Sequence, residues 1–193
     1  MPLIGSSSSS RIRWWMLLGA LIGGLAWLLS SIIDLAATSE QSLSLGAYIL
    51  VWIGTLGGLM GLYRQQARSY IWLAASSFLA AFIGAILLLL GSVLSLLSMG
   101  NVLLAQFQDQ ALGLGLFLTL FGFALFSVGF ALLGVASLLG RVIPLWCGVS
   151  IIVSPLVGWL SGVYGGVVLG LAWVAVSYAL WLEREEEPRQ ADS

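Results

Sequence analysis

Residues 142–182, VIPLWCGVSIIVSPLVGWLSGVYGGVVLGLAWVAVSYALWL, carry no charged side chain. As one helix this stretch would be about 60 Å long, twice the thickness of a hydrocarbon core of about 30 Å. It must therefore fold back on itself. Residues 161–166 hold three glycines and are the natural turn. The stretch thus predicts two membrane spans, at about 143–159 and 163–182.

The composition extends this interpretation to the whole chain. Of its 193 residues, 60% are hydrophobic and 8% are charged, whereas about a quarter of a soluble domain is charged. So few charges cannot cover a surface that faces water, and the apolar stretches are expected to face lipid. The net charge of −1 gives no reason to expect nucleic-acid binding. The sequence predicts an all-α integral membrane protein.

Four further apolar stretches precede this pair, at about 14–33, 45–62, 70–97 and 113–139. The third would be about 40 Å long as a helix, so it must tilt strongly or project beyond the lipid. Residues 101–111 mix apolar side chains with glutamines and Asp109, and are expected to lie at the membrane interface. The whole is a six-helix transmembrane domain over 14–182, between a flexible tail at 1–13 and a charged, disordered tail at 183–193.

The first span has a competing interpretation as a secretory signal peptide. Arg11 and Arg13 precede it, and the small residues Ala36 and Ala37 follow it. Its apolar run of about 20 residues is long enough to span and longer than a typical signal core. We therefore expect a membrane span.

The positions of the arginines predict the orientation of the spans. With six spans, all seven basic residues fall on one side: Arg11, Arg13, Arg64, Arg68, Arg141, Arg184 and Arg189. The other side holds Asp34, Glu40 and Asp109 and no basic residue. A seventh span within residues 70–105 would move Arg141 to that side. The sequence therefore favours six spans with both termini in the cytoplasm.

The residue types present exclude most cofactor and catalytic chemistry. The chain has no histidine, no lysine and a single cysteine, Cys147. A Ser–His–Asp triad, a His-ligated haem, a retinal Schiff base and an intrachain iron–sulfur cluster therefore lack their ligands. No acidic pair lies within a span to serve two-carboxylate or Mg²⁺ chemistry. We expect no enzyme activity, no catalytic or metal site and no cofactor.

The acidic residues outside the spans are candidate binding groups. Asp109, beside Gln106, Gln108 and Gln110, could be a binding or gating carboxylate, but a solvated loop acid is the favoured interpretation. The same holds for Asp34 and Glu40, and the run Glu183–Glu187 is expected to be a solvated helix end. Cys147 lies near the cytoplasmic edge and could be acylated, although a packed thiol is favoured.

Small residues and hydroxyls recur along the spans. The small residues lie at regular helical spacings: Gly19 and Gly23; Gly54, Gly57, Gly58 and Gly61; Gly115, Gly122, Gly129 and Ala136; Gly158, Gly162, Gly166 and Gly170. They could line a substrate groove, but packing seams against another span or a partner are favoured. Span hydroxyls can bond to their own helix: Thr55, Ser76, Ser77, Thr119, Ser127, Ser150 and Ser154. The letters GLAW occur at 24–27 and 170–173, which is too short a match to define a repeat.

Four short segments carry a resemblance to a known family. They are Gly61-Leu62-Tyr63-Arg64, Gly122-Phe123-Ala124-Leu125-Phe126, Arg141-Val142-Ile143-Pro144-Leu145-Trp146 and Tyr178-Ala179-Leu180-Trp181. Over most of its length the chain resembles an uncharacterised family of small six-span bacterial inner-membrane proteins. The resemblance implies a multi-pass protein of the bacterial inner membrane, and it implies no known activity or site residues.

Two functional hypotheses follow from these patterns. The first is a structural or accessory subunit that packs against other membrane proteins, or against copies of itself. The second is a small carrier or channel for a neutral or apolar solute. An enzyme is a distant third.

Overall fold

The computed structural model describes residues 6–36, 41–66, 71–99, 105–141, 143–161 and 163–191. These ranges contain six helices and no strand: α1 (Ser6–Leu35), α2 (Gln41–Gln66), α3 (Ile71–Met99), α4 (Ala105–Leu139), α5 (Leu145–Ser161) and α6 (Val163–Ala191). By length and composition, α1 to α4 can each cross a membrane, while the apolar stretches found in α5 and α6 are shorter. The expectation of an all-α chain with helices long and apolar enough to cross a membrane is confirmed.

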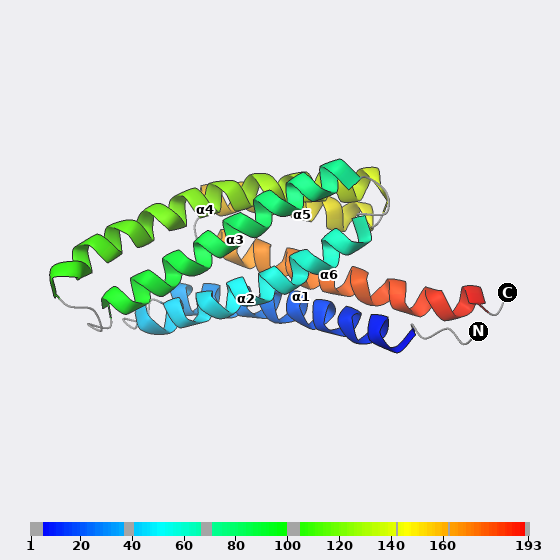
Figure 1. Ribbon diagram of the computed structural model, residues 1–193, viewed down its shortest axis with the longest axis horizontal. Helices are drawn as coiled ribbons and strands as arrows, with labels where there is room; N and C mark the ends of the chain where they lie inside the picture. The colour runs from blue at the N-terminus through cyan, green and yellow to red at the C-terminus, as the bar shows by residue number, and fades with distance from the viewer. Residues whose placement is uncertain are drawn as a thin grey trace.

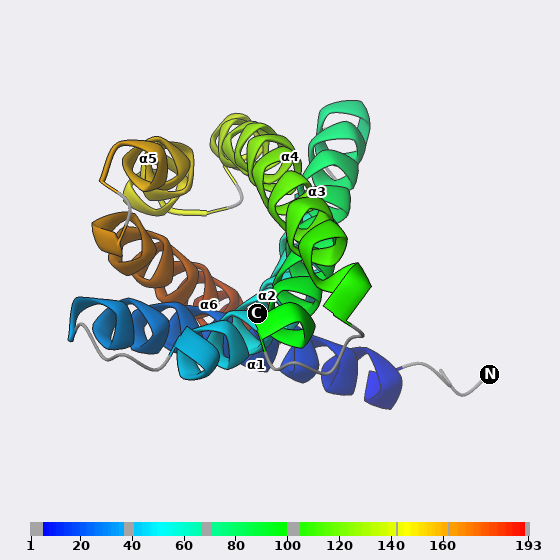
Figure 2. The same ribbon diagram turned by 90° about the vertical axis from the view of Figure 1, so that its left-hand side faces the viewer.

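The helices form a ring in chain order (Figure 2). Each helix packs against the next one, and α6 packs against α1, which closes the ring. A few contacts also run from α2 to α4 and to α6 across the middle. The start of α1 and the end of α6 lie at the same end of the bundle (Figure 1).

Both tails are helical for longer than the sequence predicted. Residues 6–13, expected to be flexible, belong to α1, while residues 1–5 lie outside the described part. α6 continues to Ala191 through the segment that was expected to be disordered. Extending an existing helix avoids the unfavourable nucleation step, and glutamate and arginine are good helix formers. The flexible-tail and disordered-tail predictions were wrong for these residues.

The hairpin of α3 and α4 is the longest part of the bundle. α4 begins at Ala105, so part of the expected interfacial segment forms its first turns, and residues 101–104 lie outside the described part. With 35 residues, α4 is about 52 Å long. Figure 1 shows this hairpin reaching further than the α1–α2 and α5–α6 connections at the end away from the termini.

The turn between α5 and α6 is narrower than predicted. α5 ends at Ser161 and α6 begins at Val163, so Gly165 and Gly166 are helical. A methyl group on Gly165 would overlap the backbone of Gly158, and one on Gly166 would meet the Ser31 side chain. These two glycines therefore permit close helix packing and do not form the turn.

Glycines also bring the other helix pairs together. A methyl group on Gly54 of α2 would lie 2.5 Å from Cα of Gly23 in α1. One on Gly129 of α4 would lie 2.8 Å from Cα of Ala81 in α3. Close backbone approach is how spans associate where lipid removes the hydrophobic drive. The prediction of packing seams is confirmed, and these seams are filled by helices of this chain.

Candidate functional site

Aromatic side chains fill the centre of the ring. Trp27 of α1 lies between Tyr48 and Trp52 of α2, with ring centroids 5.8 and 5.3 Å away. The row continues through Trp52–Phe126, Phe126–Phe130 and Phe130–Trp173, at 5.5, 5.2 and 5.1 Å. Each such pair stabilises the fold by about 0.5–1.5 kcal/mol beyond the burial of its area. This aromatic row joins α1, α2, α4 and α6 through the centre of the ring.

The two GLAW segments meet where α1 packs against α6. A methyl group on Gly24 would lie 3.0 Å from the Gly170 carbonyl oxygen, and one on Gly170 would lie 2.9 Å from that of Gly24. The tryptophan three residues after each glycine, Trp27 or Trp173, enters the aromatic row. The GLAW match is too short to define a repeat. Its two copies nevertheless contact each other in the same way, where the antiparallel helices α1 and α6 pack together.

The acidic residues do not form a site. Asp34 lies in α1 and accepts a 2.8 Å hydrogen bond from the Tyr48 hydroxyl, so the interpretation of Asp34 as a simple solvated loop acid was wrong. Asp109 lies on α4 and is exposed, as expected for a solvated acid. Glu40 lies outside the described residues, and Glu183–Glu187 lie on α6.

Gln66 connects α2 to α4 and was missed by the sequence reasoning. Its Nε2 donates to the Leu133 carbonyl oxygen at 3.0 Å and to the Ser137 hydroxyl. Such interhelical bonds within membranes contribute about 0.6 kcal/mol on average. Gln66 had been placed in the loop before α3, whereas α2 continues to include it. The sequence contains no sign of this contact, because it does not show that α4 lies beside the end of α2.

Most span hydroxyls are bonded to their own helices, as predicted. Ser76, Ser77, Thr119, Ser150 and Ser154 donate to carbonyl oxygens three or four residues earlier. Thr55 and Ser127 are buried and have no hydrogen-bond partner among the described residues. Cys147 is fully buried in the core, which confirms the packed thiol. In the described part of the chain, His, Cys, Asp and Glu form no group of three or more that could hold a metal.

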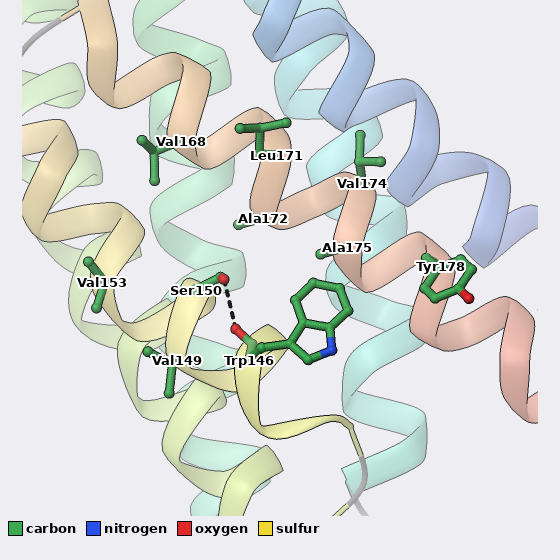
Figure 3. Close-up of a pocket in the computed structure, with 10 residues that line it drawn as sticks. All are labelled: Trp146, Val149, Ser150, Val153, Val168, Leu171, Ala172, Val174, Ala175 and Tyr178. Atoms are coloured by element: carbon green, nitrogen blue, oxygen red, sulfur yellow. Dashed lines mark hydrogen bonds between the residues drawn. The ribbon is translucent and has the colours of Figure 1, made fainter.

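A groove with a volume of about 650 Å³ lies between α5 and α6 (Figure 3). Its lining, which we call the α5–α6 groove, is Trp146, Val149, Ser150 and Val153 of α5 and Val168, Leu171, Ala172, Val174, Ala175 and Tyr178 of α6. The Ser150 hydroxyl donates to the Trp146 carbonyl oxygen at 2.7 Å. The groove therefore presents an apolar surface between two aromatic side chains at one end and two valines at the other.

Divergent packing of α5 and α6 opens this groove. The two helices touch near their turn, where Gly158 meets Gly165. Toward its beginning α5 leans on α4, where a methyl group on Gly134 would lie 3.1 Å from the Gly148 carbonyl oxygen. Toward its end α6 leans on α1, and the Ser177 hydroxyl donates to the Leu17 carbonyl oxygen at 3.4 Å. The helices thus separate with distance from the turn.

Comparison with protein families, with curated proteins and with solved structures finds no match. The function must be argued from the residues of this chain.

Proposed function

We propose that this chain is a six-span protein of the bacterial inner membrane with both ends in the cytoplasm. The separation of all seven arginines from Asp34, Glu40 and Asp109 supports that orientation. The even number of helices and the shared end of α1 and α6 agree with it. In this proposal α5 and α6 also cross the membrane, although their apolar stretches are shorter than those of α1 to α4. The bilayer can become thinner around a short span at a modest cost in free energy.

Within that membrane the chain acts as an accessory subunit, without catalytic chemistry, that packs against the spans of a partner protein. The observation that carries this function is an apolar stripe on α4. The stripe consists of Leu114, Phe117, Phe121, Val128 and Leu132, each at least 38% exposed. Phe117 and Phe121 stack with centroids 6.2 Å apart and planes at 3°.

The spacing and position of the α4 stripe fit a helix partner. Its residues are three, four or seven positions apart, the spacing at which one helix meets another at a shallow crossing angle. Gly115, Gly122 and Gly129 of α4 occupy a different face, which is already filled by α3. Aromatic side chains are enriched in the cores of protein interfaces. The stripe therefore offers a preformed surface on the hairpin that extends furthest from the bundle.

A native purification tests this function. The untagged protein, extracted from its own membranes in mild detergent, is expected to migrate with a stoichiometric partner in a native mass measurement. Phe117→Ala with Phe121→Ala is expected to release the partner, because hot-spot aromatic side chains typically contribute about 2 kcal/mol or more to an interface. The matched control is Leu25→Ala with Leu29→Ala, two exposed residues at the same spacing on α1.

The control pair is expected to retain the partner. A monodisperse monomer that transports a solute into liposomes would contradict the accessory function. Equal loss of the partner in both double variants would contradict the assignment to the α4 stripe.

A second function, a carrier for an apolar solute, is favoured by the α5–α6 groove. The groove volume lies within the range of about 300–1,000 Å³ that is usual for small-molecule sites. Transport activity of the purified chain alone would select this function over the accessory one.

A further inference from the structure

We propose that the α5–α6 groove binds one phospholipid of the cytoplasmic leaflet, with an acyl chain along the groove and the phosphate beside Arg141. This inference goes beyond the accessory function. It uses only the proposed orientation, which places the Arg141 end at the cytoplasmic interface.

The groove has the chemistry and shape of an acyl-chain site. Its walls are mainly valine, leucine and alanine, and its serine hydroxyl, on Ser150, is already bonded to the Trp146 carbonyl oxygen. Figure 3 shows the Trp146 indole turned into the space between the two helices and Tyr178 at the same end. From Val168 to Tyr178 the α6 wall extends about 15 Å along the helix axis. That is half the depth of a hydrocarbon core of about 30 Å, so the groove matches one leaflet.

The residues at the open end supply a place for the phosphate. Arg141 is exposed and lies in the turn that leads into α5, five positions before Trp146. It is the only charged residue between Asp109 and Glu183. It adopts φ 51°, a left-handed conformation in which glycine is the usual residue at a helix C-terminus. The N-terminus of α5 points to the same interface, and its dipole favours an anion there.

The headgroup must provide the selectivity of this site. An acyl chain gains little by moving from lipid into an apolar groove, because its surroundings are apolar in both places. A basic residue near an anionic surface contributes about 1 kcal/mol, which is about a fivefold preference. A phosphate-bearing lipid is therefore expected to bind in preference to a neutral lipid with the same chains.

Photocrosslinking of the full chain in nanodiscs tests the proposal. The probe is phosphatidylglycerol with a diazirine in the middle of one acyl chain, and labelled peptides are mapped by mass spectrometry. Labelling is expected to concentrate on α5 and α6 around Val149, Val153 and Leu171. The matching diacylglycerol probe, which lacks the phosphate, is expected to label the groove about fivefold less.

Four variants separate the groove from the headgroup site. Val149→Phe fills the groove from its exposed wall, and Ala175→Phe fills it from the floor; both are expected to reduce groove labelling to the level found on lipid-facing parts of α4. Leu79→Phe adds a ring at an exposed position of α3, which does not pack against α5 or α6, and is expected to leave groove labelling unchanged. Arg141→Gln is expected to remove the preference for the phosphate-bearing probe.

Three results would overturn the proposal. The first is labelling spread evenly over the lipid-facing positions of α4, α5 and α6. The second is groove labelling that persists in the folded Val149→Phe variant. The third is groove labelling that is equal for both probes. All three would leave the partner measurement for the accessory function unaffected, since that measurement concerns α4.

Discussion

Gly129→Leu is expected to destabilise the bundle by about 3 kcal/mol or more, at the upper end of the range for overpacking. A methyl group at this position would already lie 2.8 Å from Cα of Ala81 and 2.8 Å from the Ser77 carbonyl oxygen. Backbone atoms cannot move aside as a flexible side chain can, so α3 and α4 must separate. Thermal unfolding in detergent is expected to show a midpoint lower by roughly 10 °C.

Gly113→Leu is the matched control for this seam. Gly113 lies on the same helix, and a methyl group there would have nothing within 4 Å. Leucine is a better helix former than glycine by up to about 1 kcal/mol, so this variant is expected to be neutral or more stable. If the two variants had similar midpoints, the α3–α4 seam would not be packed as described.

Trp173→Ala is expected to destabilise the protein by about 3–5 kcal/mol, the usual result of emptying a large buried site. Trp173 is fully buried, stacks on Phe130 and lies against Gly58 of α2. Its indole Nε1 has no hydrogen-bond partner among the described residues. Trp173→Phe therefore removes part of the ring volume without breaking a hydrogen bond among the described residues. It is expected to lose less than half as much stability as the alanine variant.

Trp72→Ala provides the control for the aromatic row, because Trp72 is 87% exposed. It is expected to change the unfolding midpoint little. Chemical unfolding of the unmodified protein and of the Trp173→Ala, Trp173→Phe and Trp72→Ala variants in one detergent measures the differences in the free energy of unfolding. Equal losses of unfolding free energy in Trp72→Ala and Trp173→Ala would mean that the aromatic row does not hold α6 against the core.

The helices and the α3–α4 seam could be predicted because they depend on patterns along one helix. Gly115, Gly122 and Gly129 recur every seven residues, and that period alone defines the face on which α3 packs. The length of the uncharged run 142–182 likewise required a turn near residue 162. These features need no knowledge of the neighbouring helix.

The groove and the aromatic row depend on which helices become neighbours, and the sequence carries little information about that. The spans are apolar on nearly every side, so the pattern does not separate their lipid face from their packed face. Gly165 looked like part of a turn, whereas its close approach to Gly158 lets α5 and α6 touch before the two helices diverge. Gln66 looked like a loop residue until α4 was seen beside it.

The proposed orientation of the spans underlies the placement of the groove in the cytoplasmic leaflet, and labelling of single cysteines in intact cells tests this orientation directly. In a Cys147→Ser background, Gln110→Cys is expected to react with a membrane-impermeant maleimide from outside. Pro188→Cys is expected to react only after the cells are permeabilised. Labelling of Pro188→Cys in intact cells, or protection of Gln110→Cys, would contradict a six-span protein with all seven arginines in the cytoplasm.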